Sequence, residues 1–317
     1  MSSIVTITLN PAIDKSTAVA ELLPDKKMKC DPPVFEPGGG GINVARAIKR
    51  LGGNAKAIYL GGGHTGKFFN QLLDKEEVDS SVIEIAAHTR ENLIVLDKKN
   101  NKQYRFGMPG PSVKDEECQQ ILALLEDMND VSFLVASGSI PPGIPADIYA
   151  RIASITKRKK IKLVVDTSGE PLKLALNAGV FLIKPNLGEL ATLAEKERLT
   201  TDKAETTAKQ ILKEKKCEVI IISLGEAGAM LVSSKETMTV KAPVVERKST
   251  VGAGDSMTAG IVYSLSKGWS LQQAVQYGVA CGTAATMNAG TELCHKDDAD
   301  RLYDLIKQEH SNLPYRF

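Results

Sequence analysis

Short β-branched runs and helical apolar patterns alternate along most of the chain. Residues 4–9 (Ile-Val-Thr-Ile-Thr-Leu) predict a strand that Pro11 ends. Further strands are predicted at residues 55–60, 133–136, 162–166, 180–183 and 219–223, and helices at about 42–48, 114–127, 146–158, 171–177, 187–194 and 203–215. This alternation predicts an α/β fold with a mostly parallel sheet between two helix layers. Ligands of such sheets bind beyond the carboxyl ends of the strands.

Two segments depart from this pattern. Residues 15–35 contain three prolines and the basic group at 26–29, without helical periodicity. Residues 91–106 contain two β segments joined by Lys-Lys-Asn-Asn. Both segments predict short strands that leave the main sheet.

Composition narrows the class of protein. The 317 residues are 43% hydrophobic, enough for a large core, and 40 basic against 38 acidic residues give a net charge of +2. We therefore expect no nucleic-acid partner. The five cysteines lack metal-ligand spacing, and neither a leader sequence nor an apolar run of membrane-spanning length is evident. We expect a cytoplasmic protein with reduced thiols and no membrane partner.

The strongest candidate chemistry lies at residues 249–257. Gly252 and Gly254 allow a tight turn, and the apolar spacing of Met257, Ile261 and Leu265 predicts a helix that follows it. Unpaired backbone N–H groups at such a helix start attract anions. Asp255 could accept a proton from a hydroxyl beside this anion hole, and we expect the helix N-terminus to lower its pKa. The alternative is an ordinary turn with Asp255 as the helix N-cap.

Two other glycine-rich stretches imitate nucleotide motifs. Residues 61–67 fit GxxxxGK, but Phe68 stands where a P-loop needs Ser or Thr. Residues 38–41 resemble a dinucleotide fingerprint, but Asn43 replaces its third glycine and no acidic residue ends the next strand. A P-loop enzyme or an oxidoreductase is therefore unsupported. The four glycines instead allow close approach to a polar ligand, with the Asn43 amide facing hydroxyls.

Two polar pairs are more ambiguous. Asn186 and Glu189 could hold Mg²⁺ through water, or they could form a helix capping box. Arg90 and Arg105, near the ends of the second excursion, could bind a phosphate monoester, or they could simply be solvated.

The glycine run at 38–41 with Asn43, together with residues 250–255 (Thr-Val-Gly-Ala-Gly-Asp), resembles the ribokinase-like (PfkB) family of sugar kinases. Residues 8–14, 137–143 and 184–186 narrow the resemblance to the phosphosugar kinases of that family, and residues 36–41, 103–106 and 290–294 to its minor bacterial 6-phosphofructokinases. Asn10-Pro11 is more similar to members that act on fructose 1-phosphate or tagatose 6-phosphate. These substrates remain alternatives, as does a phosphosugar sensor without turnover.

The resemblance implies transfer of the ATP γ-phosphoryl group to the 1-hydroxyl of fructose 6-phosphate. It implies a core of residues 1–14, 36–89 and 107–317, and a β lid of residues 15–35 and 90–106 that often pairs between subunits, giving a homodimer. It gives Asp255 as base and Gly252, Ala253 and Gly254 as anion hole. The substrate residues it implies are Asp14, Lys27, Gly39, Asn43, Arg90, Arg105 and Ser139. The nucleotide residues are Lys184, Asn186, Ser223, Gly225, Val279 and Thr283. Glu189 and Asn186 would organise Mg²⁺, and a K⁺ loop would use Ser249, Val251, Ala285, Asn288, Gly290 and Glu292.

Overall fold

Nine strands form the main sheet of the computed structural model, which describes residues 3–214 and 217–311. Their order across the sheet is β13-β12-β11-β10-β9-β8-β1-β4-β5. Their bounds are β1 (Ser3–Thr8), β4 (Lys56–Gly61), β5 (Ser80–Glu84), β8 (Val131–Ser137), β9 (Lys162–Asp166), β10 (Val180–Ile183), β11 (Cys217–Ser223), β12 (Ala229–Ser233) and β13 (Thr237–Val240). The run β11-β10-β9-β8-β1-β4-β5 pairs in parallel throughout, and the β12–β13 hairpin adds an antiparallel edge. The predicted α/β class is confirmed.

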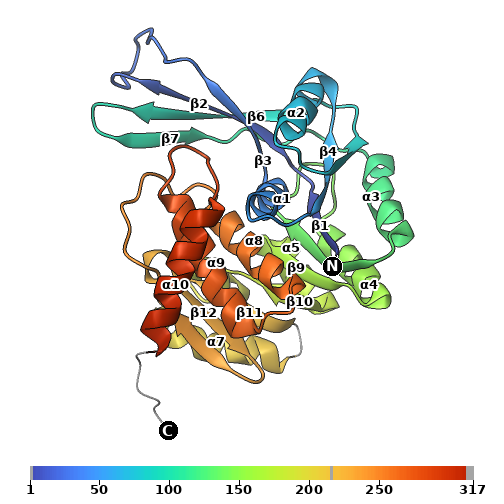
Figure 1. Cartoon of the computed structure of the whole chain (residues 1–317). Coiled ribbons are helices and arrows are strands. Elements are labelled where there is room, and N and C mark those ends of the chain that lie inside the picture. The colour runs from blue at the N-terminus through green and yellow to red at the C-terminus, as the bar shows by residue number, and fades with distance from the viewer. Residues whose placement is uncertain (1–2, 215–216, 312–317) are drawn as a thin grey trace.

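Helices cover both faces of this sheet because its strands are apolar on both sides (Figure 1). In β8, Phe133 and Val135 point into one core, and Leu134 and Ala136 into the other. The first core is closed by α1 (Gly40–Arg50), α2 (Gly63–Lys75), α8 (Ala253–Ser266), α9 (Leu271–Thr286) and α10 (Lys296–Ser311). The second is closed by α3 (Asp115–Asp127), α4 (Ile148–Lys159), α5 (Gly169–Ala178), α6 (Leu187–Leu193) and α7 (Thr201–Lys213).

The two predicted excursions form a separate sheet that extends from one end of the core (Figure 1). Its strands, in the order β3-β2-β6-β7, are β2 (Ala12–Val19), β3 (Val34–Gly38), β6 (Arg90–Asp97) and β7 (Lys102–Phe106). We call this four-stranded sheet the lid. Strand β2 begins just after β1, and β3 runs directly into the glycines that open α1. The junction of lid and core therefore carries Asp14 and the glycine run.

All five cysteines carry free thiols. Among the helices described, none combines the length and the apolar character that a membrane crossing requires.

Candidate active site

The first turn of α8 opens with an αL glycine, as the glycine-turn pattern predicts. Gly252 is the N-cap residue, with φ 73°, and a Cβ there would lie 2.6 Å from Leu293 Cδ2. Only glycine combines this backbone with that contact. Asp255 is the third residue of the helix, so the alternative in which it is the N-cap is wrong. No side-chain cap is formed within the described chain, which leaves the first-turn N–H groups to a ligand.

Asp255 is held from two sides. Asn43 Nδ2 of α1 donates a 2.8 Å hydrogen bond to Asp255 Oδ2. The pKa of Asp255 is raised from 3.8 to about 6, mainly by burial and secondly by the negative charge of Asp166, against the lowering effects of Asn43 and Lys184. The predicted lowering by the helix N-terminus is therefore wrong, because burial and a second carboxylate outweigh the dipole. A base with a pKa near 6 is better matched to proton transfer at neutral pH than an ordinary aspartate.

Lys184, which follows β10, lies beside the same helix turn. Its Nζ is 3.2 Å from Asp166 Oδ2, and a Cβ on Gly254 would lie 3.4 Å from it. Burial alone would lower the pKa of Lys184, but Asp166 and Asp255 raise it overall, so the ammonium stays charged. This buried cation next to the anion hole can face a phosphate.

Asp166 was not assigned a role from the sequence. Its Oδ2 also accepts a 3.0 Å hydrogen bond from Thr258 Oγ1 of α8. The available signal was its position directly at the end of β9, next to the place where Lys184 follows β10. A lone aspartate at a strand end was too weak a pattern to distinguish it.

On the lid side, Asp14 of β2 faces the glycine run. A Cβ on Gly38 would lie 2.1 Å from Asp14 Oδ2, and Gly39 is the N-cap of α1 with φ 117°. Asn92 of β6, which was not predicted, donates a 2.8 Å hydrogen bond to Asp14 Oδ1. Burial is the largest influence on the pKa of Asp14, which is raised. The glycines thus allow two backbone segments to meet around one carboxylate.

The two arginines approach this region from different strands. Arg90 donates 2.9 Å hydrogen bonds to the carbonyls of Asn10 and Met108, so it is anchored to the backbone. Arg105 Nη2 reaches Thr250 Oγ1, just before the anion hole, at 3.4 Å. Ser139 Oγ accepts a 3.0 Å hydrogen bond from Asn10 Nδ2, which brings it close to the same side.

Lys27 is the predicted substrate residue that the fold does not bring to this site. It lies in the exposed connection between β2 and β3, beyond Val19. Asp14 lies near the opposite end of β2, and five extended residues span roughly 17 Å. The bridge between Val19 and Cys30 closes the connection at that far end, so the structure places Lys27 at the other end of β2 from the Asp14 of its own chain.

All of the predicted nucleotide residues except Lys184 line one crevice. This crevice of about 550 Å³ includes Asn186, Ser223, Gly225, Val279 and Thr283 in its wall, together with Ala253 and Gly254 of the anion hole. It is thus continuous with the site around Asp255. Val279 and Thr283 of α9 therefore lie in the same crevice as the residues that follow strand ends.

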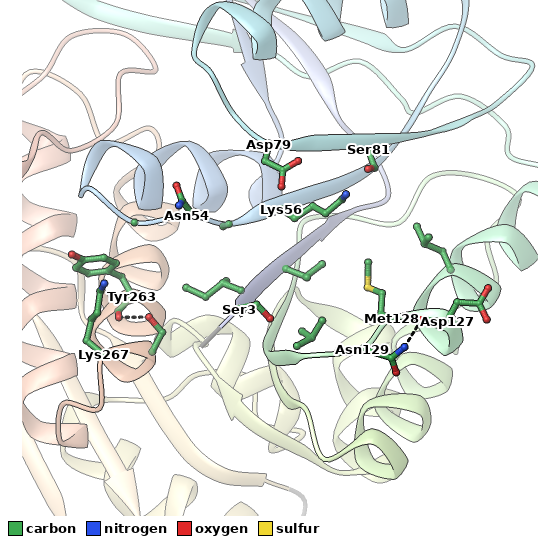
Figure 2. Close-up of a pocket in the computed structure, with 17 residues that line it drawn as sticks. Ser3, Asn54, Lys56, Asp79, Ser81, Asp127, Met128, Asn129, Tyr263 and Lys267 are labelled. Carbon is green, nitrogen blue, oxygen red and sulfur yellow. Dashed lines mark hydrogen bonds between the residues drawn. The ribbon is translucent and has the colours of Figure 1, made fainter. Parts of the chain in front are cut away.

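A second cavity, of about 610 Å³, lies at the opposite edge of the sheet (Figure 2). Its lining includes Ser3 and Lys56, which begin β1 and β4, and Lys267 beyond the C-terminal end of α8. Asp255 lies at the other end of that helix. This cavity contains none of the predicted site residues, so we place the active site at the carboxyl edge.

The residues predicted to organise Mg²⁺ form the alternative capping box. Asn186 Oδ1 accepts from the Glu189 N–H, and Glu189 Oε2 accepts from the Asn186 N–H, both at 2.9 Å. A carboxylate has further acceptor sites, so this bond leaves capacity for Mg²⁺ or its waters. Within the described residues, no three His, Cys, Asp or Glu side chains form a metal-binding group. The residues fit a Mg²⁺ ion that is held mainly by phosphates.

The segments predicted to hold K⁺ are neighbours. Ser249 Oγ donates to the Gly290 carbonyl at 2.7 Å, and Ser249 N to the Thr286 carbonyl at 3.3 Å. The Ala285 carbonyl instead accepts from the Asn288 N–H, and Glu292 contacts His295 at 2.8 Å. Val251 follows on the same loop.

Comparison with known proteins gives matches over almost the whole length. The pattern of the pfkB family carbohydrate kinases matches residues 3–298. ATP-dependent 6-phosphofructokinase isozyme 2 from Escherichia coli (strain K12) is 41% identical over 309 residues, which are 97% of this chain and 100% of that protein. The 1-phosphofructokinase of Borreliella burgdorferi is 32% identical over 307 residues, 96% of this chain and 98% of that protein.

Solved structures agree with this similarity. Phosphofructokinase-2 from Escherichia coli in complex with potassium is similar with a TM-score of 0.93 and 41% identity, and the same enzyme in complex with fructose-6-phosphate with 0.92 and 39%. Each alignment covers 97% of this chain and 100% of the other.

Proposed function

Because the chain belongs to the pfkB family of carbohydrate kinases, we propose that it is an ATP-dependent 6-phosphofructokinase. It moves the γ-phosphoryl group of ATP to the 1-hydroxyl of fructose 6-phosphate and yields fructose 1,6-bisphosphate. The observation that carries this proposal is the position of Asp255. It lies in the anion-binding turn of α8, between Asn43 on the lid side and Lys184 near the nucleotide crevice.

Each group of residues has a separate role in the phosphoryl transfer. Asp14, Gly39 and Asn43 orient the sugar so that its hydroxyl meets Asp255. The hydroxyl proton passes to a carboxylate oxygen of Asp255 as the new O–P bond forms, while the bond between the γ-phosphorus and the β–γ bridging oxygen breaks and ADP leaves. Phosphoryl transfer has a loose transition state with charge on the equatorial oxygens, so positioning and neutralisation dominate. The N–H groups of the first turn of α8 and the Lys184 ammonium supply that neutralisation.

Two groups of residues would hold cations. Glu189 and Asn186 would hold Mg²⁺ or its waters, and the ion would supply charge neutralisation for the ATP phosphates. The loop of Ser249 and Gly290 would hold K⁺ beside the anion-binding turn. The potassium complex of the 41% identical relative supports this second assignment.

Substrate choice rests on the phosphate of the sugar. Arg90, Arg105 and Ser139 bind this phosphate, and the relative at 41% identity has been solved with fructose-6-phosphate. Fructose 1-phosphate remains the second candidate, because a 1-phosphofructokinase aligns over nearly the whole chain. Tagatose 6-phosphate is a third.

A single coupled assay of ADP release tests the function. Fructose 6-phosphate, fructose 1-phosphate and tagatose 6-phosphate are supplied in turn with ATP, Mg²⁺ and K⁺. We expect the highest kcat/KM with fructose 6-phosphate. A higher value with either other sugar phosphate would change the assignment within the family, and absence of ADP release with all three would favour a sensor.

The exposed surface of the lid supports a second proposal, about the assembly of the protein. Its strands expose Val34, Tyr104 and Phe106, and Met108 lies just beyond them, so apolar surface borders open strand edges. We propose that two copies pair through their lids as a homodimer. The same pairing is the way in which Lys27 could act on a sugar, by reaching the site of the partner.

A further inference from the structure

Arg46 of α1 is buried, with 1% of its surface exposed, and all of its N–H groups have acceptors. Nε and Nη2 form a fork onto the Glu76 carboxylate at 2.8 and 2.5 Å. Nη2 also reaches Glu36 of the lid strand β3 at 3.3 Å. Nη1 donates to the Pro37 carbonyl at 2.8 Å and to Asn43 Oδ1 at 3.3 Å.

The last of these bonds has a consequence for the catalytic carboxylate. A guanidinium contains only donors, so Arg46 can face only the oxygen end of the Asn43 amide. The amide NH₂ must then point the other way, where it donates to Asp255 Oδ2. A flipped amide would place NH₂ against the guanidinium and oxygen against the carboxylate, losing both hydrogen bonds.

We propose that Arg46 is a positioning residue for phosphoryl transfer: it fixes the orientation in which the Asn43 amide meets Asp255 and ties that orientation to the lid strand β3. This inference rests on the proposed kinase function. Glu36 of β3 also connects the lid to a second part of the core. It accepts a hydrogen bond from Thr291, near the predicted K⁺ loop. A displacement of β3 would therefore reach Asp255 through two side chains, Arg46 and Asn43.

A double-mutant cycle separates this role from simple stabilisation. Arg46→Lys keeps the charge near Glu76 and Glu36 but lacks the planar fork that also reaches Asn43. We expect it to lower kcat about 10- to 100-fold, the usual effect of a misplaced catalytic group. In an Asn43→Ala background, the same change should lower kcat less than about threefold, because the group through which Arg46 acts is gone.

The pH profile gives a second readout. Loss of the hydrogen bond from Asn43 raises the pKa of Asp255, so the acid limb of kcat/KM should move to higher pH in Arg46→Lys. Ile48→Ala is the matched control. Ile48 is fully buried on the same helix, so its truncation destabilises the fold without touching the Asn43 amide, and the acid limb should not move.

Two results would overturn the inference. The first is that the effects of Arg46→Lys and Asn43→Ala on kcat simply multiply, and the second is an acid limb that stays in place. If Arg46→Lys does not fold, Glu76→Gln is used in the same cycle, since it weakens the anchoring fork and should lower kcat about three- to tenfold through Asn43. A wild type that rejects fructose 6-phosphate overturns the substrate proposal instead, and the cycle is then measured with the sugar phosphate that it accepts.

Discussion

Replacing Asp255 by asparagine should stabilise the protein while nearly abolishing turnover. The pKa of Asp255 is raised from 3.8 to about 6, mainly by burial, so the folded protein binds this proton more tightly than the unfolded chain does. The stability that this proton gives is complete below pH 3.8 and is lost as the pH rises through about 6. A shift of about 2 units corresponds to about 3 kcal/mol. Since the carboxylate keeps some contact with solvent, we expect a cost of about 2–3 kcal/mol at neutral pH.

An asparagine stays neutral and can still accept the hydrogen bond from Asn43. Urea unfolding should therefore give Asp255→Asn a free energy of unfolding about 2–3 kcal/mol above wild type at pH 8, and about half that difference at pH 5. Its kcat should fall about 10²- to 10⁴-fold, because no base remains for the sugar hydroxyl. Asp304→Asn, which changes an exposed carboxylate, should alter the free energy of unfolding by less than about 0.5 kcal/mol.

Equal stability of Asp255→Asn and wild type at pH 8 would refute this account of the buried charge. A stability difference that is the same at pH 8 and pH 5 would refute it as well. Retention of more than about a tenth of the wild-type kcat would contradict the role of Asp255 as base.

Three further predictions follow from named contacts. Gly38→Ala would force a Cβ against Asp14, so KM for the sugar should rise at least about tenfold. In the control Gly107→Ala the new Cβ enters open space, and KM should not change. Equal KM values for the two variants would contradict this role of Gly38. Arg105→Ala should lower kcat/KM for fructose 6-phosphate about 10- to 100-fold without changing the affinity for ATP alone, and an equal loss with unphosphorylated fructose would show that it does not bind the phosphate. Phe106→Glu in the lid should convert a dimer to a monomer in sedimentation velocity at micromolar concentration, and an unchanged sedimentation coefficient would exclude lid pairing.

The sequence predicted the parallel strands well because each is a short β-branched run between strong turn signals. Strand β9 is an example: its predicted bounds, 162–166, are those observed. The hairpin of β12 and β13, strand β5 and helices α2, α9 and α10 were not predicted. Helix α9 is apolar and small-residue rich on most of its surface, so its periodicity is weak. Strand β12 is antiparallel to both of its neighbours, so it does not continue the alternation of parallel strands and helices on which the strand predictions rest.

Site residues could be predicted where the backbone geometry or the chemistry requires one particular residue type. Gly252, Gly39 and Asp255 are such cases, since the turn requires glycine and the transfer requires a base. The direction of the Asp255 pKa shift was not predictable, because it depends on burial and on Asp166, far away in sequence. The positioning role of Arg46 could not be predicted for the same reason. Its hydrogen-bond acceptors, at positions 36, 37, 43 and 76, become neighbours only when the lid, α1 and the core are folded together.

Strand β1 is synthesised first but lies in the interior of the sheet, between β4 and β8, so it cannot be paired on both sides until both of those strands have been made. The lid strands and the glycine turn of α1 are also synthesised early. Asp255 and its anion-binding turn are synthesised only after β13 is complete. A nascent chain thus lacks the base and the phosphate-stabilising turn until late in translation, so an unfinished chain cannot transfer the phosphoryl group. The enzyme becomes active only with the segment that also supplies α9 and α10 to close its first core.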